Sequence, residues 1–88
     1  MAAPDASAVE RSVTSFIVDN FLFGNAADAP STTTSFMETG LIDSTGVLEL
    51  VAFVEEKYGI MVGDDELIPE HLDSVTNLAA FVVKKAGG

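Results

Sequence analysis

The chain has 88 residues with fourteen acidic and four basic side chains, which gives a formal net charge of −10. A surface this acidic repels the phosphates of nucleic acids and of anionic lipids, and it favours basic protein surfaces as partners. Because the sequence holds no cysteine, disulfides, thiolate metal sites and a thiol nucleophile are excluded.

No stretch is apolar over the roughly 20 residues that a membrane-spanning helix needs, and the first residues lack the pattern of a secretory signal. We therefore expect a cytoplasmic, monomeric protein without membrane insertion. Its length suits one domain with a modest core. We expect a single free-standing domain over residues 1–88, with a loose leader at residues 1–6 and a frayed tail at residues 87–88.

The first expected helix spans residues 8–22, where apolar side chains recur at helical spacing. A capping box is expected at its start, with the Ser7 hydroxyl and the Glu10 carboxylate each accepting a backbone N–H. Gly24 and Asn25 are expected to end this helix.

A loop without periodicity covers residues 25–35, and Phe36 and Met37 are expected to hold its far end against the core. The second long helix is expected over residues 44–58, with Gly59 ending it. Its apolar face carries Val47, Leu50, Val51, Val54 and Tyr58.

A short third helix is expected to start at Asp64 and to end near Pro69, because acidic side chains favour the positive end of a helix. Asp73 and Ser74 are expected to cap a fourth helix. The expected core or core edge includes Phe16, Phe21, Phe36, Phe53 and Phe81. The fold class is therefore all-α, a small bundle of three main helices plus one short helix.

The stretch from Gly40 to Leu50 is the most informative for function. It places Ser44, directly after Asp43, at the start of an amphipathic helix. The unpaired N–H groups and the positive field of a helix N-terminus favour a phosphate on that serine. The same two residues are also an ordinary helix cap, so physical chemistry alone indicates only a suitable acceptor.

This stretch resembles the attachment site of acyl carrier proteins, and the resemblance extends over nearly the whole order of helices and loops. It implies a carrier that performs no catalysis and has no catalytic residues. Ser44 would bear a covalent 4′-phosphopantetheine arm derived from coenzyme A. Asp43, Thr45 and Gly46 would complete the attachment motif.

The resemblance also implies partners. A phosphopantetheinyl transferase would add the arm, an acyl- or amino-acid-activating ligase would load it, and a downstream acyltransferase or synthase would take the cargo. The residues that the resemblance places on the docking face are Leu48, Glu49, Ala52, Glu55 and Glu56.

Two departures from fatty-acid carriers bear on the cargo. Thr45 and Gly46 stand where such carriers usually have leucine and an acid, and Gly40 stands four residues before Ser44 rather than three. This pattern is closer to D-alanyl and other aminoacyl carriers, so we expect a short or aminoacyl thioester. The bulk of Phe16, Phe21 and Tyr58 could fill the space that a long chain would need, whereas the small Ala52 and Ala79 leave a pocket open as the alternative.

Gly46 has two open explanations at this point. Glycine inside a helix costs about 1 kcal/mol relative to alanine, and less in the first turn. Either the first turn frays, or the missing Cβ lets a partner approach the arm closely.

Two other functions also stay open. The chain could be a non-enzymatic interaction module that binds a basic partner through the glutamates of the second helix. A minimal hydrolase would use Ser44, His71 and an acid, but the sequence supplies no oxyanion hole, and His71 is expected to be a surface or packing residue. Residues 64–66 lack the pattern of a calcium loop, so we expect a solvated helix start and no metal.

Overall fold

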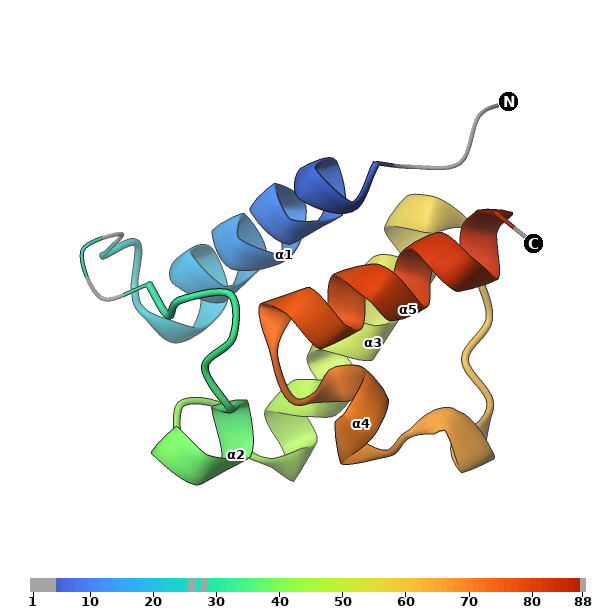
Figure 1. Cartoon of the computed structure of the whole chain (residues 1–88). Coiled ribbons are helices and arrows are strands. Elements are labelled where there is room, and N and C mark those ends of the chain that lie inside the picture. The colour runs from blue at the N-terminus through green and yellow to red at the C-terminus, as the bar shows by residue number, and fades with distance from the viewer. Residues whose placement is uncertain (1–4, 26, 28, 88) are drawn as a thin grey trace.

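The computed structural model describes residues 5–25, 27 and 29–87. The helical elements are α1 (Ala6–Phe21), α2 (Phe36–Thr39), α3 (Ser44–Tyr58), the 3-10 turn η2 (Asp64–Glu66), α4 (Pro69–Leu72) and α5 (Val75–Gly87). The described ranges contain no strand. Three long helices accompanied by short ones confirm the expected all-α bundle (Figure 1).

The three long helices enclose one core. α1 packs along α5, α3 contacts both of them, and α4 packs against α5 (Figure 1). Each long helix buries one apolar face, as its spacing requires. The buried apolar residues are Val9, Val13, Ile17, Phe36, Ile42, Leu50, Val51, Val54, Ile60, Leu72, Val75, Leu78, Ala79, Phe81 and Val82. Phe16, Phe21 and Phe53 pack half-buried against this core, which confirms the expectation for all five phenylalanines.

The start of α1 differs from the expected capping box. The helix begins at Ala6, and its N-cap residue Asp5 makes no side-chain cap hydrogen bond. Ser7 lies inside the helix, and a carboxylate oxygen of Glu10 lies 3.5 Å from the hydroxyl of Thr76 on α5. The expected capping box was wrong, because Ser7 stands inside the helix and Glu10 faces α5.

The expected leader and tail are only partly covered by the described residues. Residues 1–4 of the leader and Gly88 of the tail lie outside the described residues. Gly87 is the last residue of α5. At the other end of α1, Gly24 adopts a left-handed φ of 81° and donates its N–H to the carbonyl of Val18, which agrees with a helix ending here.

Asp73 ties the loop before α3 to the junction between α4 and α5. Its carboxylate accepts hydrogen bonds from the Ser35 hydroxyl and from the Met37 N–H, the latter at 3.0 Å. Its carbonyl accepts from the Phe36 N–H at 2.8 Å. The cap of α5 is Ser74 alone, whose hydroxyl accepts from the N–H of Asn77. Asp73 therefore fixes α2, a helix that the sequence did not reveal.

The expected helix over residues 64–69 is instead two elements. η2 ends at Glu66, and Pro69 is the first residue of α4 rather than the last residue of a helix. Proline has no N–H to donate and a φ suited to the first helical position, so it begins a helix more readily than it continues one.

Among the described residues, no helix is both long enough and apolar enough to cross a membrane.

Candidate functional site

Ser44 is the first residue of α3, and its side chain is exposed. Asp43 before it has extended backbone and caps the helix, because its Oδ1 accepts the N–H of Gly46 at 2.8 Å. Its carbonyl accepts the N–H of Val47 at 2.9 Å. Within the described part of the chain, the Ser44 hydroxyl makes no side-chain hydrogen bond. The cap therefore belongs to Asp43, and the serine oxygen is left available for reaction.

Gly46 is buried in the first turn of α3, which Asp43 holds closed. A Cβ on Gly46 would lie 2.6 Å from Cγ2 of Ile42 and 2.9 Å from Cε1 of Phe21. Real Cβ atoms do not approach neighbours so closely, so these side chains would have to shift. The glycine lets the start of α3 pack against α1, and this differs from both explanations drawn from the sequence.

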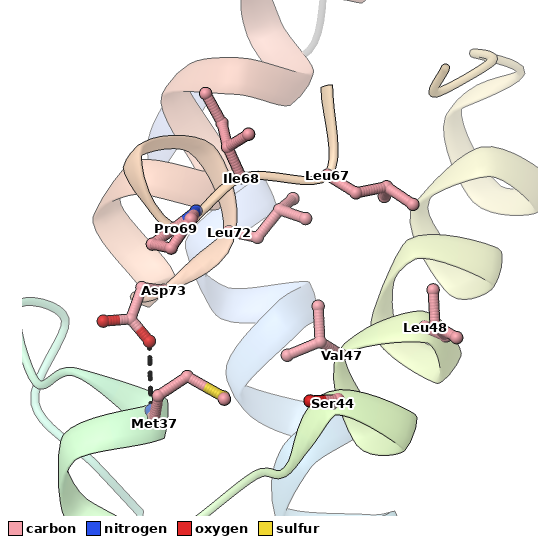
Figure 2. Close-up of a pocket in the computed structure, with 9 residues that line it drawn as sticks. All are labelled: Met37, Ser44, Val47, Leu48, Leu67, Ile68, Pro69, Leu72 and Asp73. Atoms are coloured by element: carbon pink, nitrogen blue, oxygen red, sulfur yellow. Dashed lines mark hydrogen bonds between the residues drawn. The ribbon is translucent and has the colours of Figure 1, made fainter. Parts of the chain in front are cut away.

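An apolar pocket of about 260 Å³ opens beside Ser44 (Figure 2). It is lined by Met37, Ser44, Val47, Leu48, Leu67, Ile68, Pro69, Leu72 and Asp73. In Figure 2, Ser44 and Met37 lie on one side of the pocket, with Leu67 and Ile68 across from them. The walls come from α2, α3, α4 and the residues between η2 and α4. This arrangement places an apolar recess next to the candidate acceptor oxygen.

The sequence did not reveal this pocket. Phe16, Phe21 and Tyr58, whose bulk could have filled the space for a chain, do not line it. Phe16 instead stacks on Phe53, with ring centroids 4.4 Å apart, at the contact of α1 with α3. The expectation misplaced the space because it considered α1 and α3 alone. A pair of aliphatic residues, Leu67 and Ile68, directly after an acidic run was the available signal.

One curated relative covers almost the whole chain. A protein of Akkermansia muciniphila named acyl carrier protein is 35% identical over 81 residues, which make up 92% of this chain and 96% of that protein. This chain belongs to the acyl carrier protein family. No family model matches it.

The five residues expected from the sequence to form a docking face lie along α3. Leu48, Glu49, Ala52 and Glu56 are exposed, and Leu48 retains 54% of its accessible surface. Glu55 differs, because it is half-buried and its Oε2 accepts the N–H of Val62 at 2.9 Å. Four of the five expected residues therefore form an open face on α3, while Glu55 is engaged within the protein.

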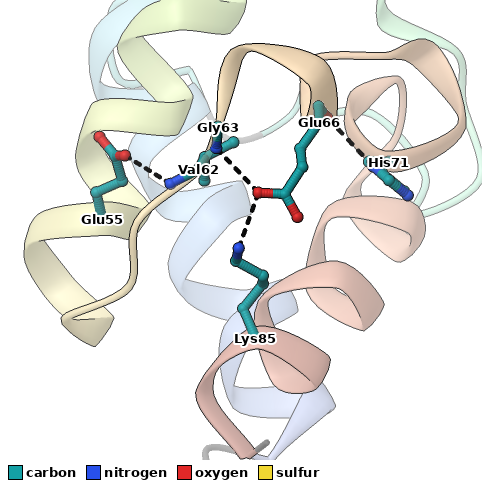
Figure 3. A network of polar contacts seen from close by, with 6 residues as sticks. All are labelled: Glu55, Val62, Gly63, Glu66, His71 and Lys85. Carbon is teal, nitrogen blue, oxygen red and sulfur yellow. Dashed lines mark hydrogen bonds and ion pairs between the residues drawn. The ribbon is translucent and has the colours of Figure 1, made fainter.

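Residues 64–66 are also not uniformly solvated. Asp64 and Asp65 are exposed, but the carboxylate of Glu66 accepts from the Lys85 ammonium at 2.8 Å and from the Gly63 N–H at 2.9 Å (Figure 3). The Lys85 hydrogen bond, followed by that of Gly63, lowers the pKa of Glu66. The expectation of a solvated helix start was wrong for this residue. Among the residues described, no group of three or more acidic or imidazole side chains is placed to hold a metal ion.

His71 is a packing residue in this member of the acyl carrier protein family. Its ring stacks on Phe81 with centroids 4.6 Å apart, and its Nδ1 lies 3.2 Å from the carbonyl oxygen of Glu66. His71 does not line the pocket beside Ser44. The geometry thus gives no support to a hydrolase built on Ser44 and His71.

Proposed function

We propose that this protein is a phosphopantetheine-dependent carrier that performs no catalysis itself. The observation that carries the proposal is the exposed Ser44 oxygen at the start of α3, with Asp43 bound as the cap and an apolar pocket alongside. Membership of the acyl carrier protein family supports the same role. The arm supplies a terminal thiol that holds a short acyl or aminoacyl group as a thioester.

The residues around Ser44 fit a phosphodiester there. The Ser44 oxygen would bond to the phosphorus of the phosphopantetheine group of coenzyme A, lose its proton, and displace the adenosine bisphosphate. A transferase can reach this oxygen because the side chain is exposed. The positive end of the helix dipole of α3 stabilises the phosphate that results. Asp43 keeps the turn closed without competing for the serine hydroxyl.

The pocket supports a short cargo. Its volume of about 260 Å³ lies below the roughly 300–1,000 Å³ of pockets that enclose drug-sized ligands. Seven of its nine lining residues are apolar, the exceptions being Ser44 and Asp73. The apolar part of a short acyl group would gain by entering it, whereas the ammonium of an aminoacyl group would stay at the solvent.

Partner enzymes would dock on the exposed part of α3 beside Ser44. Leu48 and Ala52 offer an apolar contact, and Glu49 and Glu56 offer negative charge. Basic surfaces on a phosphopantetheinyl transferase, an activating ligase and a downstream acyltransferase or synthase would be steered there. Such transfers fit a carrier that works in the cytoplasm.

The test is an intact mass measurement. Wild-type protein incubated with coenzyme A and a phosphopantetheinyl transferase should gain the mass of one phosphopantetheine group. Ser44→Ala should gain nothing, while Thr45→Ala, which removes the neighbouring exposed hydroxyl, should still be modified. An unmodified wild-type protein, or a modified Ser44→Ala variant, would overturn the proposal. Lack of modification is the result that the acidic interaction module predicts.

A further inference from the structure

The wall of the pocket opposite Ser44 has little secondary structure of its own. Leu67 and Ile68 lie between η2, which has 3 residues, and α4, which has 4. The backbone hydrogen bonds of Leu67 and Ile68 stay within residues 64–72 and do not reach a long helix. The position of this wall therefore depends on what ties it to the long helices.

One tie runs from Glu66 to α5. Glu66 directly precedes Leu67, and its Oε1 accepts from the Nζ of Lys85 at 2.8 Å. The same oxygen accepts the N–H of Gly63 at 2.9 Å, which closes the η2 turn (Figure 3). The Glu66 and Lys85 side chains retain 27% and 30% of their accessible surface, so the pair is partly shielded from water. His71 adds a contact at 3.2 Å to the Glu66 carbonyl.

A second tie runs from Glu55 on α3 to the backbone of Val62. The Oε2 of Glu55 accepts the N–H of Val62 at 2.9 Å, near the start of the segment that leads to the wall (Figure 3). Glu55 belongs to the same helix as Val47 and Leu48, which line the pocket on its other side. The segment is thus held to α3 near one end and to α5 near the other.

We propose that Glu66 and Glu55 are positioning residues that set the width of the pocket beside Ser44, and so the length of the acyl group it accepts. This inference rests on the proposed carrier function. Both carboxylates act on the cargo only through Leu67 and Ile68, which they hold in place across the pocket from Ser44. Weakening either tie lets this wall move outward, and the pocket then accepts a longer chain.

The test uses the absence of cysteine from this chain. Ser44→Cys creates a single thiol at the pocket, and ethyl, butyl or octyl methanethiosulfonate then attaches an alkyl group of chosen length as a disulfide. The quantity measured is the rise in melting temperature on labelling, for each chain length. It is compared in the Ser44→Cys parent and in the same protein carrying Glu66→Gln, Lys85→Met or Glu55→Gln. Glu70→Gln, which removes an exposed acid on α4, is the matched control.

In the parent and the Glu70→Gln control, butyl should raise the melting temperature and octyl should add nothing further. In the Glu66→Gln, Lys85→Met and Glu55→Gln variants, octyl should exceed butyl by a few degrees. In the Lys85→Arg variant, the rise in melting temperature should depend on chain length as it does in the parent, because arginine keeps a positive charge beside Glu66. Glu66→Gln combined with Lys85→Met should match the single variants, since the two residues form one tie.

A merely structural role gives a different result. The unlabelled variants would then melt lower, while the rise on labelling would keep the parent's dependence on chain length, and this outcome would overturn the inference. So would a parent that no alkyl group stabilises. Because labelling at Cys needs no transferase, failure of the proposed function appears separately, as wild-type protein that takes up no phosphopantetheine.

Discussion

The carboxylate of Asp73 and the backbone N–H of Met37 are 3.0 Å apart, although 36 positions separate them in the sequence. Asp73 also accepts from the hydroxyl of Ser35, so one half-buried side chain fixes α2 to the junction of α4 and α5. Met37 and Asp73 both line the pocket beside Ser44. The shape of the pocket therefore depends on this contact.

Asp73→Ala should lower the free energy of unfolding by about 1.5–3 kcal/mol, the range for hydrogen bonds to charged groups. Urea denaturation measures the change. Asp65→Ala, at an exposed acid, is the control and should stay within about 0.5 kcal/mol of wild type. Equal stability of the two variants would show that the Asp73 contacts contribute nothing to the fold.

Ser44→Ala should leave the fold intact while it abolishes attachment of the arm. Because Asp43 is the cap, the loss of the serine hydroxyl should change the free energy of unfolding by less than about 0.5 kcal/mol. Asp43→Ala should cost about 1 kcal/mol. Circular dichroism during urea denaturation gives both values, and a Ser44→Ala variant less stable than Asp43→Ala would contradict the assignment of the cap.

Gly46→Ala should destabilise the protein, although alanine favours a helix by about 1 kcal/mol. The added methyl group would press on Ile42 and Phe21, and overpacking of this kind costs about 1–3 kcal/mol. The melting temperature measures the net effect. The control is Thr45→Ala, at an exposed position of the same turn. This variant should melt close to wild type. A higher melting temperature for Gly46→Ala would show that no overpacking occurs.

Glu56→Lys should weaken the transfer reaction between this protein and a basic partner enzyme. It should leave the melting temperature unchanged, because Glu56 is exposed. The loss should appear in the association rate, and it should shrink near 0.5 M salt, where the screening length is a few ångströms. Glu55→Lys should also lower the melting temperature, since it removes the acceptor of the Val62 N–H. Rates measured over a series of salt concentrations test this, and rates independent of salt would exclude electrostatic docking.

Glu66 should add stability at neutral pH that acid removes. The Lys85 and Gly63 hydrogen bonds lower its pKa from the ordinary value of 4.5, and His71 acts in the same direction. The folded state therefore favours the charged carboxylate, so its contribution is fully present above pH 4.5 and is lost as the pH falls through the lowered pKa. The difference in urea midpoint between wild type and Glu66→Gln should accordingly shrink below pH 4.5. A difference that is the same at neutral and acidic pH would contradict this.

The long helices and the exposed serine at the start of α3 were predictable because their signals are local. Apolar residues at helical spacing predicted α1, α3 and α5 to within about two residues at their ends, the usual uncertainty of a helix boundary. The order Asp43–Ser44 before such a helix predicted both the cap and an exposed serine. Each of these features depends on neighbours within a few positions.

The rest depends on partners that are distant in the sequence. α2 has 4 residues, too few to show a period, and Asp73 holds it from another part of the chain. The need for glycine at position 46 comes from Phe21 on α1. The hydrogen bond that engages the Glu66 carboxylate comes from Lys85, 19 positions away. Nothing in a local pattern distinguishes a carboxylate that faces solvent from one that ties two elements together.

The ties made by Asp73 also bear on the order in which the protein folds. A contact between distant positions offsets the entropy lost in closing the loop between them only after that loop has closed. The α4–α5 junction must therefore be in place before α2 has a fixed position. The recess beside Ser44, which Met37 and Asp73 both line, is therefore completed only once α2 has docked on that junction.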